Sequence, residues 1–392
     1  KILLLADDLR MSSGIANMSK QLVLGSLHQY DWVQLGAAIK HPDQGKIFDL
    51  SESVRNETGV QDASVKLYPS DGYGNADIIR QLLMVEKPDA ILHFTDPRYW
   101  IWLYEIEHEI RQTTPIFFYH IWDDLPDPKY NRDYYESCDW IGCISKQTYG
   151  ITKRVWGLDN GTTWKKPQDW QVSYVPHGIN SKLYKPVDVP VDFRQSIFGD
   201  KEYDFVLYWN NRNIRRKQPV DVLLAFEEFA KGLPEEKRDK VCLLMHTSPI
   251  DENGTDLLTT IEHHCPNSKV IFTPAKYQEE GLNYLYNIAD VTINIASNEG
   301  FGLTTAESVM ASTPIIVNVT GGMQDQCGFL FQNEEVHGNW DYTRPSDYVK
   351  WGSLHDWRQW KDKLKWGDWV VPVWSTSRSF TGSPPTPYII ED

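Results

Sequence analysis

The first half of the chain alternates short apolar runs with segments of helical or loop character, as in an α/β domain. Each run is apolar at nearly every position, which is typical of a strand buried on both faces of a parallel sheet. A polar loop, Gly14 and a helical pattern over 15–27 follow the first run, so a nucleotide-binding type of α/β domain is predicted. The predicted strands are residues 1–6, 31–37, 90–94, 116–119 and 140–144.

The same alternation begins again after a proline-containing stretch near residues 185–200, which predicts a linker between two domains. A chain of 392 residues also exceeds the length at which one core usually keeps growing. We therefore predict two Rossmann-like doubly wound α/β domains, over residues 1–185 and 186–392. The second is predicted to contain strands at 204–209, 241–246, 270–273, 291–295 and 314–319, and helices at 219–231, 255–264, 278–289 and 303–311.

The alternation stops after residue 326, and an irregular, aromatic-rich tail is predicted to complete the second domain. Within the tail we predict a helix over 346–363 and an extended segment at 383–388. Six of the sixteen tryptophans lie between residues 351 and 374. Spread tryptophans more often pack in a core or an interface than form stacking platforms for sugars or bases, so no ligand is assigned to them.

A strand, a glycine turn and the start of a helix are predicted to meet at residues 297–307. An apolar run predicts the strand, Gly300 and Gly302 predict the turn, and a helical segment follows them. Amides at such a turn and the positive end of the helix dipole bind anions, and glycine lets the anion approach the main chain. Glu299 and Glu307 bracket the turn as acceptors for hydroxyl groups. A phosphate flanked by hydroxyls describes a nucleotide sugar, which is the predicted ligand.

Four cations lie within residues 212–217, in the loop after the first strand of the second domain. The carboxyl ends of parallel strands meet at one sheet edge, so this loop is predicted to lie beside the glycine turn. Arg212 can bind a diphosphate in bidentate fashion, and Lys217 can act as a point charge. The alternative is a solvated surface loop, and we assign phosphate contact to Arg212 and Lys217 ahead of Arg215 and Arg216.

His120 ends a predicted strand of the first domain and shortly precedes the acidic pair Asp123 and Asp124. Ligands of doubly wound sheets bind at the carboxyl ends of strands, so His120 is predicted to face the crevice there. The alternative, a hydrogen-bonded structural histidine, carries similar weight for a single histidine without other ligands around it.

Composition narrows the functional classes. A formal net charge of −15 disfavours a broad nonspecific grip on nucleic acid, although the cationic loop could still act locally. The five cysteines are odd in number and include no Cys-x-x-Cys pair, so reduced thiols are predicted rather than a disulfide framework or a zinc ribbon. No run reaches transmembrane length and no signal-peptide pattern opens the sequence, which predicts a cytoplasmic protein.

Four motifs in order resemble the retaining glycosyltransferases of the GT-B fold, family 4 type, over most of the chain. They are Glu299 and Glu307 around Gly300-Phe301-Gly302-Leu303, Arg212 with Lys217 five positions on, the turn Val175-Pro176-His177-Gly178-Ile179-Asn180, and His120. The sequence departs from the family pattern at Gln218, at Asn210-Asn211, and in the first loop, which is reduced to Ser13-Gly14. The tail resembles glycosyltransferases encoded by phages and other viruses.

The resemblance implies two domains that face each other across a cleft and transfer a sugar with retained configuration. It implies a nucleotide-diphosphate sugar as donor, linked to UDP, and no required metal ion or other cofactor. The implied site residues are His120, Glu299, Arg212 and Lys217 for catalysis, Gly14, Asn298, Gly300, Phe301, Gly302, Leu303, Thr304 and Glu307 for the donor, and Ser13 and Asp123 for the acceptor.

The acceptor hydroxyl stays open between two classes. The viral resemblance favours 5-hydroxymethylcytosine in viral DNA, whereas the acidic net charge favours a cell-surface glycan or a small metabolite. A sugar-nucleotide epimerase or a phosphorylase on the same fold would share the glycine turn, and a binding protein without catalysis is a third class. Neither the donor sugar nor the oligomeric state is indicated by the sequence.

Overall fold

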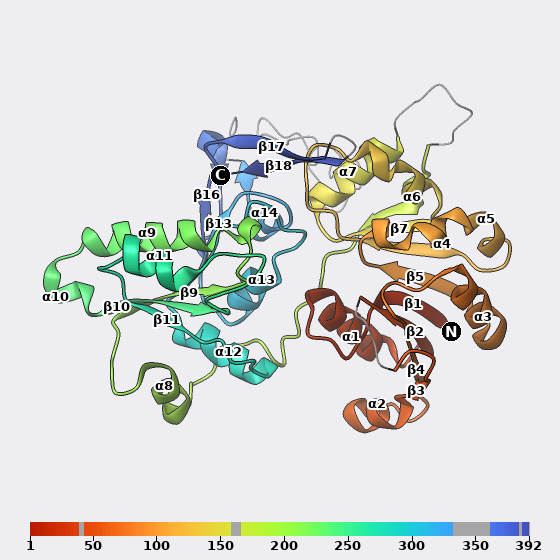
Figure 1. Cartoon of the computed structure of the whole chain (residues 1–392), viewed down its shortest axis with the longest axis horizontal. Helices are drawn as coiled ribbons and strands as arrows, with labels where there is room; N and C mark the ends of the chain where they lie inside the picture. Colours follow the sequence, from red (N-terminus) through yellow and green to blue (C-terminus); the bar gives the residue numbers. More distant parts are fainter. Residues whose placement is uncertain (39–42, 158–165, 332–360, 384–385, 392) are drawn as a thin grey trace. The chain divides into compact units, whose positions relative to one another are not determined.

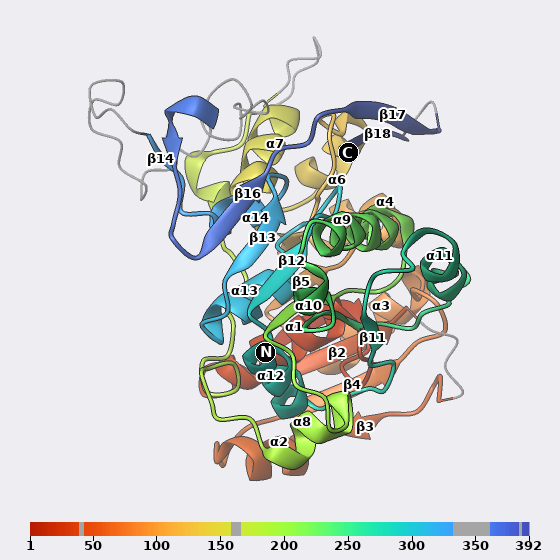
Figure 2. The same ribbon diagram turned by 90° about the vertical axis from the view of Figure 1, so that its left-hand side faces the viewer.

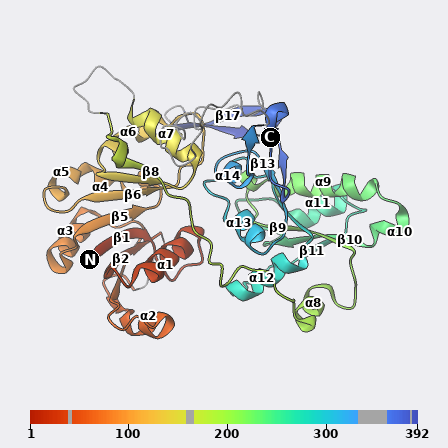
Figure 3. The ribbon, with the colours of Figure 1, turned by 180° about the vertical axis from the view of Figure 1, so that it is seen from behind.

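The structure is a computed structural model that describes residues 1–38, 43–157, 166–331, 361–383 and 386–391. The chain divides into two compact units (Figures 1 and 3). Unit 1 contains the described residues of 1–122 and 127–177, and unit 2 contains residues 123–126 together with the described residues from 178 onward. Apart from residues 123–126, the chain therefore passes from unit 1 to unit 2 between His177 and Gly178.

Unit 1 is built on an eight-stranded sheet in the order β3-β4-β2-β1-β5-β6-β7-β8. Neighbouring strands pair in parallel, except that β3 runs antiparallel to β4. Leu3, Leu4 and Leu5 are fully buried, as expected for a strand that is covered on both faces. The strands are β1 (Ile2–Asp7), β2 (Trp32–Ala37), β3 (Phe48–Asp49), β4 (Val65–Pro69), β5 (Ala90–Phe94), β6 (Ile116–His120), β7 (Trp140–Cys143) and β8 (Val172–Tyr174).

Helices connect the strands of unit 1, and polar side chains fix where several of them begin. Ser13 accepts a hydrogen bond from the Ala16 amide at the start of α1, and Asn75 accepts from two amides at the start of α3. The α-helices are α1 (Gly14–Ser26), α2 (Ser51–Thr58), α3 (Ala76–Glu86), α4 (Ile101–Glu105), α5 (Glu107–Ile110), α6 (Arg132–Glu136) and α7 (Lys146–Trp156), with 3-10 turns η1 (Pro97–Trp100), η2 (Lys129–Asn131) and η3 (Asp169–Gln171).

Unit 2 is built on a six-stranded parallel sheet in the order β11-β10-β9-β12-β13-β16. Leu207 and Trp209 of β9 pack in one core cluster with residues of α9 and α11, and Tyr208 packs in another with residues of α12. Figure 1 shows α9 and α11 on one face of this sheet and α12 on the other. The strands are β9 (Phe205–Asn210), β10 (Val241–His246), β11 (Val270–Phe272), β12 (Val291–Asn294), β13 (Ile315–Asn318) and β16 (Val370–Val373). The helices are α8 (Val191–Phe198), the 3-10 turn η4 (Arg215–Lys217), α9 (Pro219–Lys231), α10 (Glu235–Arg238), α11 (Leu257–His264), α12 (Glu279–Ile288), α13 (Leu303–Met310) and α14 (Met323–Gln326).

The described part of the tail is more regular than the sequence predicts. Strand β16 lies beside β13 and extends the sheet of unit 2 (Figure 2). It contains Pro372, which an edge strand tolerates because one side of the strand needs no partner. Residues 383 and 386–388 of the predicted extended segment are confirmed as parts of two paired strands, β17 (Arg378–Ser383) and β18 (Thr386–Glu391), whereas residues 384–385 lie outside the described residues. Strand β14 (Leu330–Phe331) pairs with β15 (Leu364–Lys365). Residues 346–360 of the predicted helix lie outside the described residues.

The stretch predicted as a linker packs against unit 2. Its residues 191–198 form α8, and Phe198 is buried in the same core cluster as Tyr208. The Lys185 amide donates to Asn283 Oδ1 of α12 at 3.1 Å. The linker prediction is therefore wrong, because proline spacing in this stretch marks the approach to a helix rather than a free connection.

All five cysteines are buried and none forms a disulfide, in agreement with the predicted reduced thiols. In the described part of the chain, no helix combines the length and the apolar character that crossing a membrane requires.

Candidate functional site

Strand order in the sheet of unit 2 reverses between β9 and β12, so the loops after these two strands diverge at the carboxyl edge. Doubly wound sheets bind ligands outside their strand ends at such a point. The loop after β9 contains η4, and the loop after β12 contains the glycine turn. The Ser297 amide donates to the Arg216 carbonyl at 2.8 Å and ties the two loops together. The cationic loop thus lies beside the glycine turn, as predicted.

The turn before α13 is held by glycines. Gly302 has φ of +85°, a conformation that glycine adopts without strain, and α13 begins directly after it. The Gly322 amide donates to the Glu299 carbonyl at 2.9 Å, and a Cβ on Gly321 would lie 1.8 Å from that oxygen. Gln326 Nε2 donates to the Gly302 carbonyl at 3.0 Å. The Gly321-Gly322 pair therefore fixes the turn by close backbone packing.

The first turn of α13 has the character of an anion site. Because the residue before the helix is Gly302, no N-cap side chain takes up the amides of the first turn. Leu303 and Thr304 are the first two helical residues, and Thr304 Oγ1 lies 3.5 Å from Asn294 Nδ2. Main-chain amides that no capping side chain accepts from, at the positive end of a helix, favour the binding of a phosphate or carboxylate.

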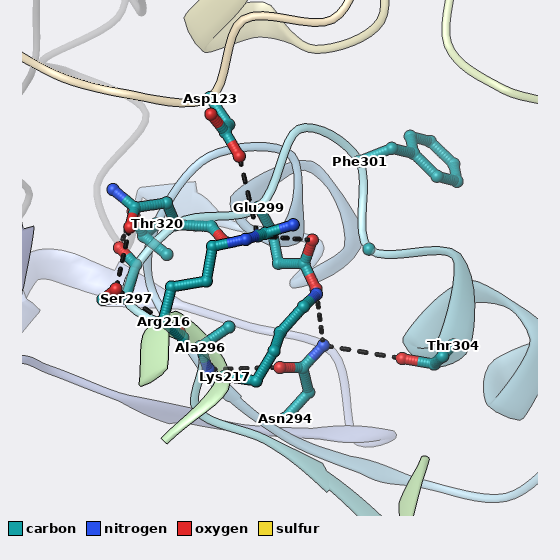
Figure 4. Close-up of polar contacts among 12 residues, drawn as sticks. Asp123, Arg216, Lys217, Asn294, Ala296, Ser297, Glu299, Phe301, Thr304 and Thr320 are labelled. Carbon is teal, nitrogen blue, oxygen red and sulfur yellow. Dashed lines mark hydrogen bonds and ion pairs between the residues drawn. The ribbon is translucent and has the colours of Figure 1, made fainter. Parts of the chain in front are cut away.

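Lys217 and Glu299 form a buried ion pair between Nζ and Oε1 beside this turn (Figure 4). Each of the two side chains is 11% exposed. Asn294 Nδ2 donates to the same carboxylate oxygen at 3.2 Å, and Arg216 Nη1 lies 3.6 Å from Glu299 Oε2. The carboxylate therefore contacts one amide and faces two cations.

Burial and charge act in opposite directions on this pair. Burial is the largest influence on Glu299 and acts to raise its pKa, but the charges of Lys217 and Arg216 outweigh it and hold the pKa below its usual range. Burial lowers the pKa of Lys217, against the opposing charge of Glu299. The result is a carboxylate that stays ionised at neutral pH beside its cations.

Arg216, rather than Arg212, is the arginine of this cluster. Arg216 Nη1 donates to the Asn298 carbonyl at 2.7 Å and lies 3.6 Å from Asp123 Oδ2. Arg212 instead binds Asp251 through two nitrogens, at 2.8 and 3.1 Å, and its side chain is 59% exposed. An acidic partner thus holds the Arg212 guanidinium in this structure, and phosphate contact by Arg212 stays a prediction.

The other residues of the predicted donor turn differ in orientation. The side-chain amide of Asn298 donates to the carboxylate of Asp124 and, at 3.1 Å, to the Ile389 carbonyl. Figure 4 shows the ring of Phe301 directed away from the Lys217 and Glu299 pair. Asn298 therefore braces the loop in this structure through its side chain, and donor contact by Asn298 and Phe301 stays a prediction.

Glu307 lies among tyrosines. Tyr286 Oη donates to Glu307 Oε2 at 2.6 Å, and Asn210 Nδ2 donates to the same tyrosine oxygen at 3.0 Å. Burial raises the pKa of Glu307 to about 7, although hydrogen bonds from Tyr286 and Tyr184 act to lower it. This carboxyl group therefore changes its charge near neutral pH.

Comparison with known proteins agrees with this geometry. Residues 192–334 match the family model of glycosyl transferases, group 1. An uncharacterized glycosyltransferase of Methanocaldococcus jannaschii is 34% identical over 234 residues, which cover 57% of this chain and 52% of that protein. The alpha-monoglucosyldiacylglycerol synthase of Acholeplasma laidlawii is 27% identical over 192 residues, which cover 48% of this chain and 44% of that protein. The chain spans about half the length of these curated relatives.

Solved structures are similar over most of the chain. Sucrose-phosphate synthase of Thermosynechococcus elongatus has a TM-score of 0.61 at 16% identity, over 91% of this chain and 95% of that one. Anabaena HepE in complex with UDP and glucose has a TM-score of 0.57 at 12% identity, over 91% and 90%. At these identities the likeness shows the fold, and the predicted α/β fold of two Rossmann-like domains, of GT-B type, is confirmed.

Outside the group 1 segment, His120 has the geometry of a structural histidine. It is 1% exposed, with Nδ1 3.0 Å from Thr152 Oγ1 and Nε2 3.2 Å from Tyr135 Oη. Burial lowers the pKa of His120 to about 3, so the ring is neutral. The structure does not direct His120 toward a ligand, and its contact with a transferred sugar stays a prediction.

The first loop of unit 1 is held by its own side chains. Ser13 Oγ donates to Asp7 Oδ2 at 2.6 Å and accepts from the Ala16 amide at 3.0 Å. Gly14 is the first residue of α1. Ser13 therefore caps this helix, and acceptor contact by Ser13 and donor contact by Gly14 stay predictions.

Two features beside the glycine turn, Asn294 and the Gly321-Gly322 pair, were not predicted as parts of the site, and Arg216 was ranked behind Arg212 and Lys217. Asn294 carried a usable signal, since a polar residue in a buried apolar run needs a buried partner. The glycine pair carried a weaker signal, because two glycines shortly after a predicted strand often mark a close backbone approach. No feature of the sequence distinguishes Arg216 from Arg212 as the arginine of the site.

Proposed function

We propose that this protein is a retaining glycosyltransferase of family 4 type that moves a sugar from a nucleotide-diphosphate sugar to an acceptor hydroxyl. The observation that carries the proposal is the buried Lys217 and Glu299 pair beside the first turn of α13. It lies at the point in the sheet of unit 2 where strand order reverses. The match of this segment to glycosyl transferases, group 1, supports the same chemistry. UDP and glucose in the structure of Anabaena HepE agree with a UDP-linked donor.

In this proposal the diphosphate lies over the first turn of α13. Lys217, Arg216 and the helix amides stabilise the negative charge that grows on the leaving group. A well-placed donor of this kind contributes roughly 3 kcal/mol to the transition state. No step uses a metal ion, because the two cations supply the positive charge that the departing diphosphate needs.

The transfer takes place on one face of the sugar. The bond between the anomeric carbon and the diphosphate oxygen breaks while the acceptor oxygen bonds to the same face of that carbon, and the acceptor proton passes to the leaving phosphate. Glu299 accepts a hydrogen bond from a hydroxyl of the transferred sugar. Glu307 accepts hydrogen bonds from the ribose hydroxyls, which its position one helical turn into α13 allows.

The experiment is an assay of nucleoside diphosphate release from a panel of radiolabelled nucleotide sugars. It is run without acceptor, with methyl glycosides, and with duplex DNA that contains 5-hydroxymethylcytosine, each with and without EDTA. We expect release that depends on an acceptor, survives EDTA, and gives a product whose anomeric configuration by NMR equals that of the donor.

The rival activities give different results in the same assay. An epimerase changes the sugar without releasing the diphosphate, a phosphorylase requires inorganic phosphate, and a binding protein releases nothing. An inverted product, or full turnover by the Glu299→Ala variant, would contradict the proposal.

A further inference from the structure

Unit 1 has a switch point of its own, which the group 1 match does not cover. Strand order there reverses between β1 and β5. The loops after β1, β4 and β5 leave the same carboxyl edge of the sheet, because these strands run parallel within one sheet. They comprise residues 8–13, 70–75 and 95–96. A doubly wound sheet uses such loops to bind a ligand.

Two tyrosines are stacked at this edge. Tyr73 comes from the loop after β4, and Tyr99 lies in η1, which follows β5. Their ring centroids are 4.6 Å apart and their planes differ by 8°. Tyr99 is 56% exposed. Because one face of the Tyr99 ring packs on Tyr73, the exposed area includes the opposite face, which forms a flat aromatic platform.

The main chain holds this platform in place. Gly72 and Gly74 flank Tyr73 with φ of +61° and +73°, so the loop takes a course that other residues adopt only with strain. Trp102 Nε1 donates to the Tyr73 carbonyl at 3.2 Å. Trp100 also packs edge-on against the Tyr73 ring, with centroids 5.9 Å apart. The stacked pair is therefore a built feature of the edge and not a loose surface ring.

Two carboxylates belong to the same edge of the sheet: Asp7 is the last residue of β1, and Asp96 directly precedes η1. Burial raises the pKa of Tyr73 to about 12, and the charges of Asp7 and Asp96 act in the same direction. The neighbouring cations are paired: Arg98 Nε donates to Asp96 at 3.0 Å, and Arg10 Nε donates to Asp8 at 3.0 Å. Because these arginines are already engaged by carboxylates, the edge disfavours a phosphate-bearing ligand and suits a neutral ligand with many hydroxyls.

We propose that Tyr73 and Tyr99 form a carbohydrate-binding platform that takes the pyranose ring of a neutral glycan or glycoside. The face of an aromatic ring is negative, so it attracts the slightly positive C–H groups on one face of a sugar ring. The inference rests on the proposed function and adds to it the class of acceptor: a neutral carbohydrate in place of the phosphate-rich backbone of DNA.

Saturation-transfer difference NMR with the full chain tests this platform. The ligands are methyl pyranosides and disaccharides, offered without any nucleotide sugar. We expect saturation of the ring C–H protons with the unmodified protein. Tyr99→Ala should lower the signal by about fivefold, the size expected for the loss of one aromatic contact, whereas Tyr99→Trp keeps an aromatic face and most of the signal.

Tyr30→Ala is the matched control. Tyr30 is a 43% exposed tyrosine that lies just before β2, at the opposite edge of the same sheet, and its loss should leave the signal unchanged. The proposal is overturned if no glycoside is saturated, if Tyr99→Ala and the unmodified protein give equal signals, or if DNA with 5-hydroxymethylcytosine binds in preference and loses binding in Tyr99→Ala.

The two proposals fail in distinguishable ways. Failure of the proposed function shows as no nucleoside diphosphate release, while glycoside binding still depends on Tyr99. Failure of the platform shows as glycosyl transfer that is the same in Tyr99→Ala as in the unmodified protein.

Discussion

Replacing Lys217 with methionine leaves Glu299 buried without its closest counter-charge. Both side chains are 11% exposed, so water cannot replace the lost partner. Breaking a buried pair by removing one member commonly costs about 3–5 kcal/mol. Arg216 at 3.6 Å and Asn294 at 3.2 Å stay beside the carboxylate. We therefore expect a loss at the lower end of this range, about 3 kcal/mol.

Differential scanning fluorimetry measures this loss. In a domain of roughly 200 residues, a change of 1 kcal/mol moves Tm by about 2–4 °C, so the transition of unit 2 should fall by roughly 6–12 °C in Lys217→Met. The double variant Lys217→Met/Glu299→Gln removes both charges and should recover most of the loss, because no unpaired buried charge remains. The pKa of Glu299 is held below its usual range, so the stabilisation by the pair is present at neutral pH and is lost as pH falls through that lowered pKa.

Two results would refute this reasoning. One is a fall in Tm of less than about 2 °C in the single variant, which would mean that Glu299 gains nothing from Lys217. The other is a double variant as unstable as the single one, which would mean that packing rather than charge decides the effect.

Further predictions concern turnover and ligand binding. Arg216→Ala should lower kcat/KM for nucleoside diphosphate release by roughly 100-fold, whereas Arg212→Ala, whose guanidinium is held by Asp251, should change it little; equal effects would restore Arg212 to the site. Burial raises the pKa of Glu307 to about 7, and a protonated carboxyl group accepts fewer hydrogen bonds from hydroxyls. The donor KM should therefore rise as pH falls below that value, and Glu307→Gln should flatten this pH profile of KM. Gly321→Ala places a Cβ 1.8 Å from a carbonyl oxygen and should weaken UDP binding by at least about tenfold in calorimetry, while Gly25→Ala, with open space around its Cβ, should leave it unchanged.

The glycine turn was predictable because its signals are local. The apolar run gave a strand at 291–295 and the structure has Val291–Asn294, and the helix predicted at 303–311 is Leu303–Met310. Each depends on residues within a few positions in sequence. The identity of the arginine beside it was not predictable, because Arg212 is held by Asp251, a partner 39 positions further on in the chain.

His120 and β16 show two other limits. Alternation along a strand says that neighbouring side chains point to opposite faces, but the helices that cover each face decide which side chain is buried. Here Tyr135 of α6 and Thr152 of α7 take up His120. Strand β16 has four residues including Pro372, too short and too irregular a pattern to separate from a loop before its parallel partner β13 is known.

Isothermal titration calorimetry of UDP binding tests the central claim, that the turn between β12 and α13 and its lysine hold a nucleoside diphosphate. The comparison is between the unmodified protein and the double variant Lys217→Met/Glu299→Gln, which keeps its fold by the reasoning above. The account predicts that the unmodified protein binds UDP and that the double variant binds it at least about tenfold more weakly. Equal affinity in the two proteins, or no binding of UDP, ADP or GDP by the unmodified protein, would contradict it.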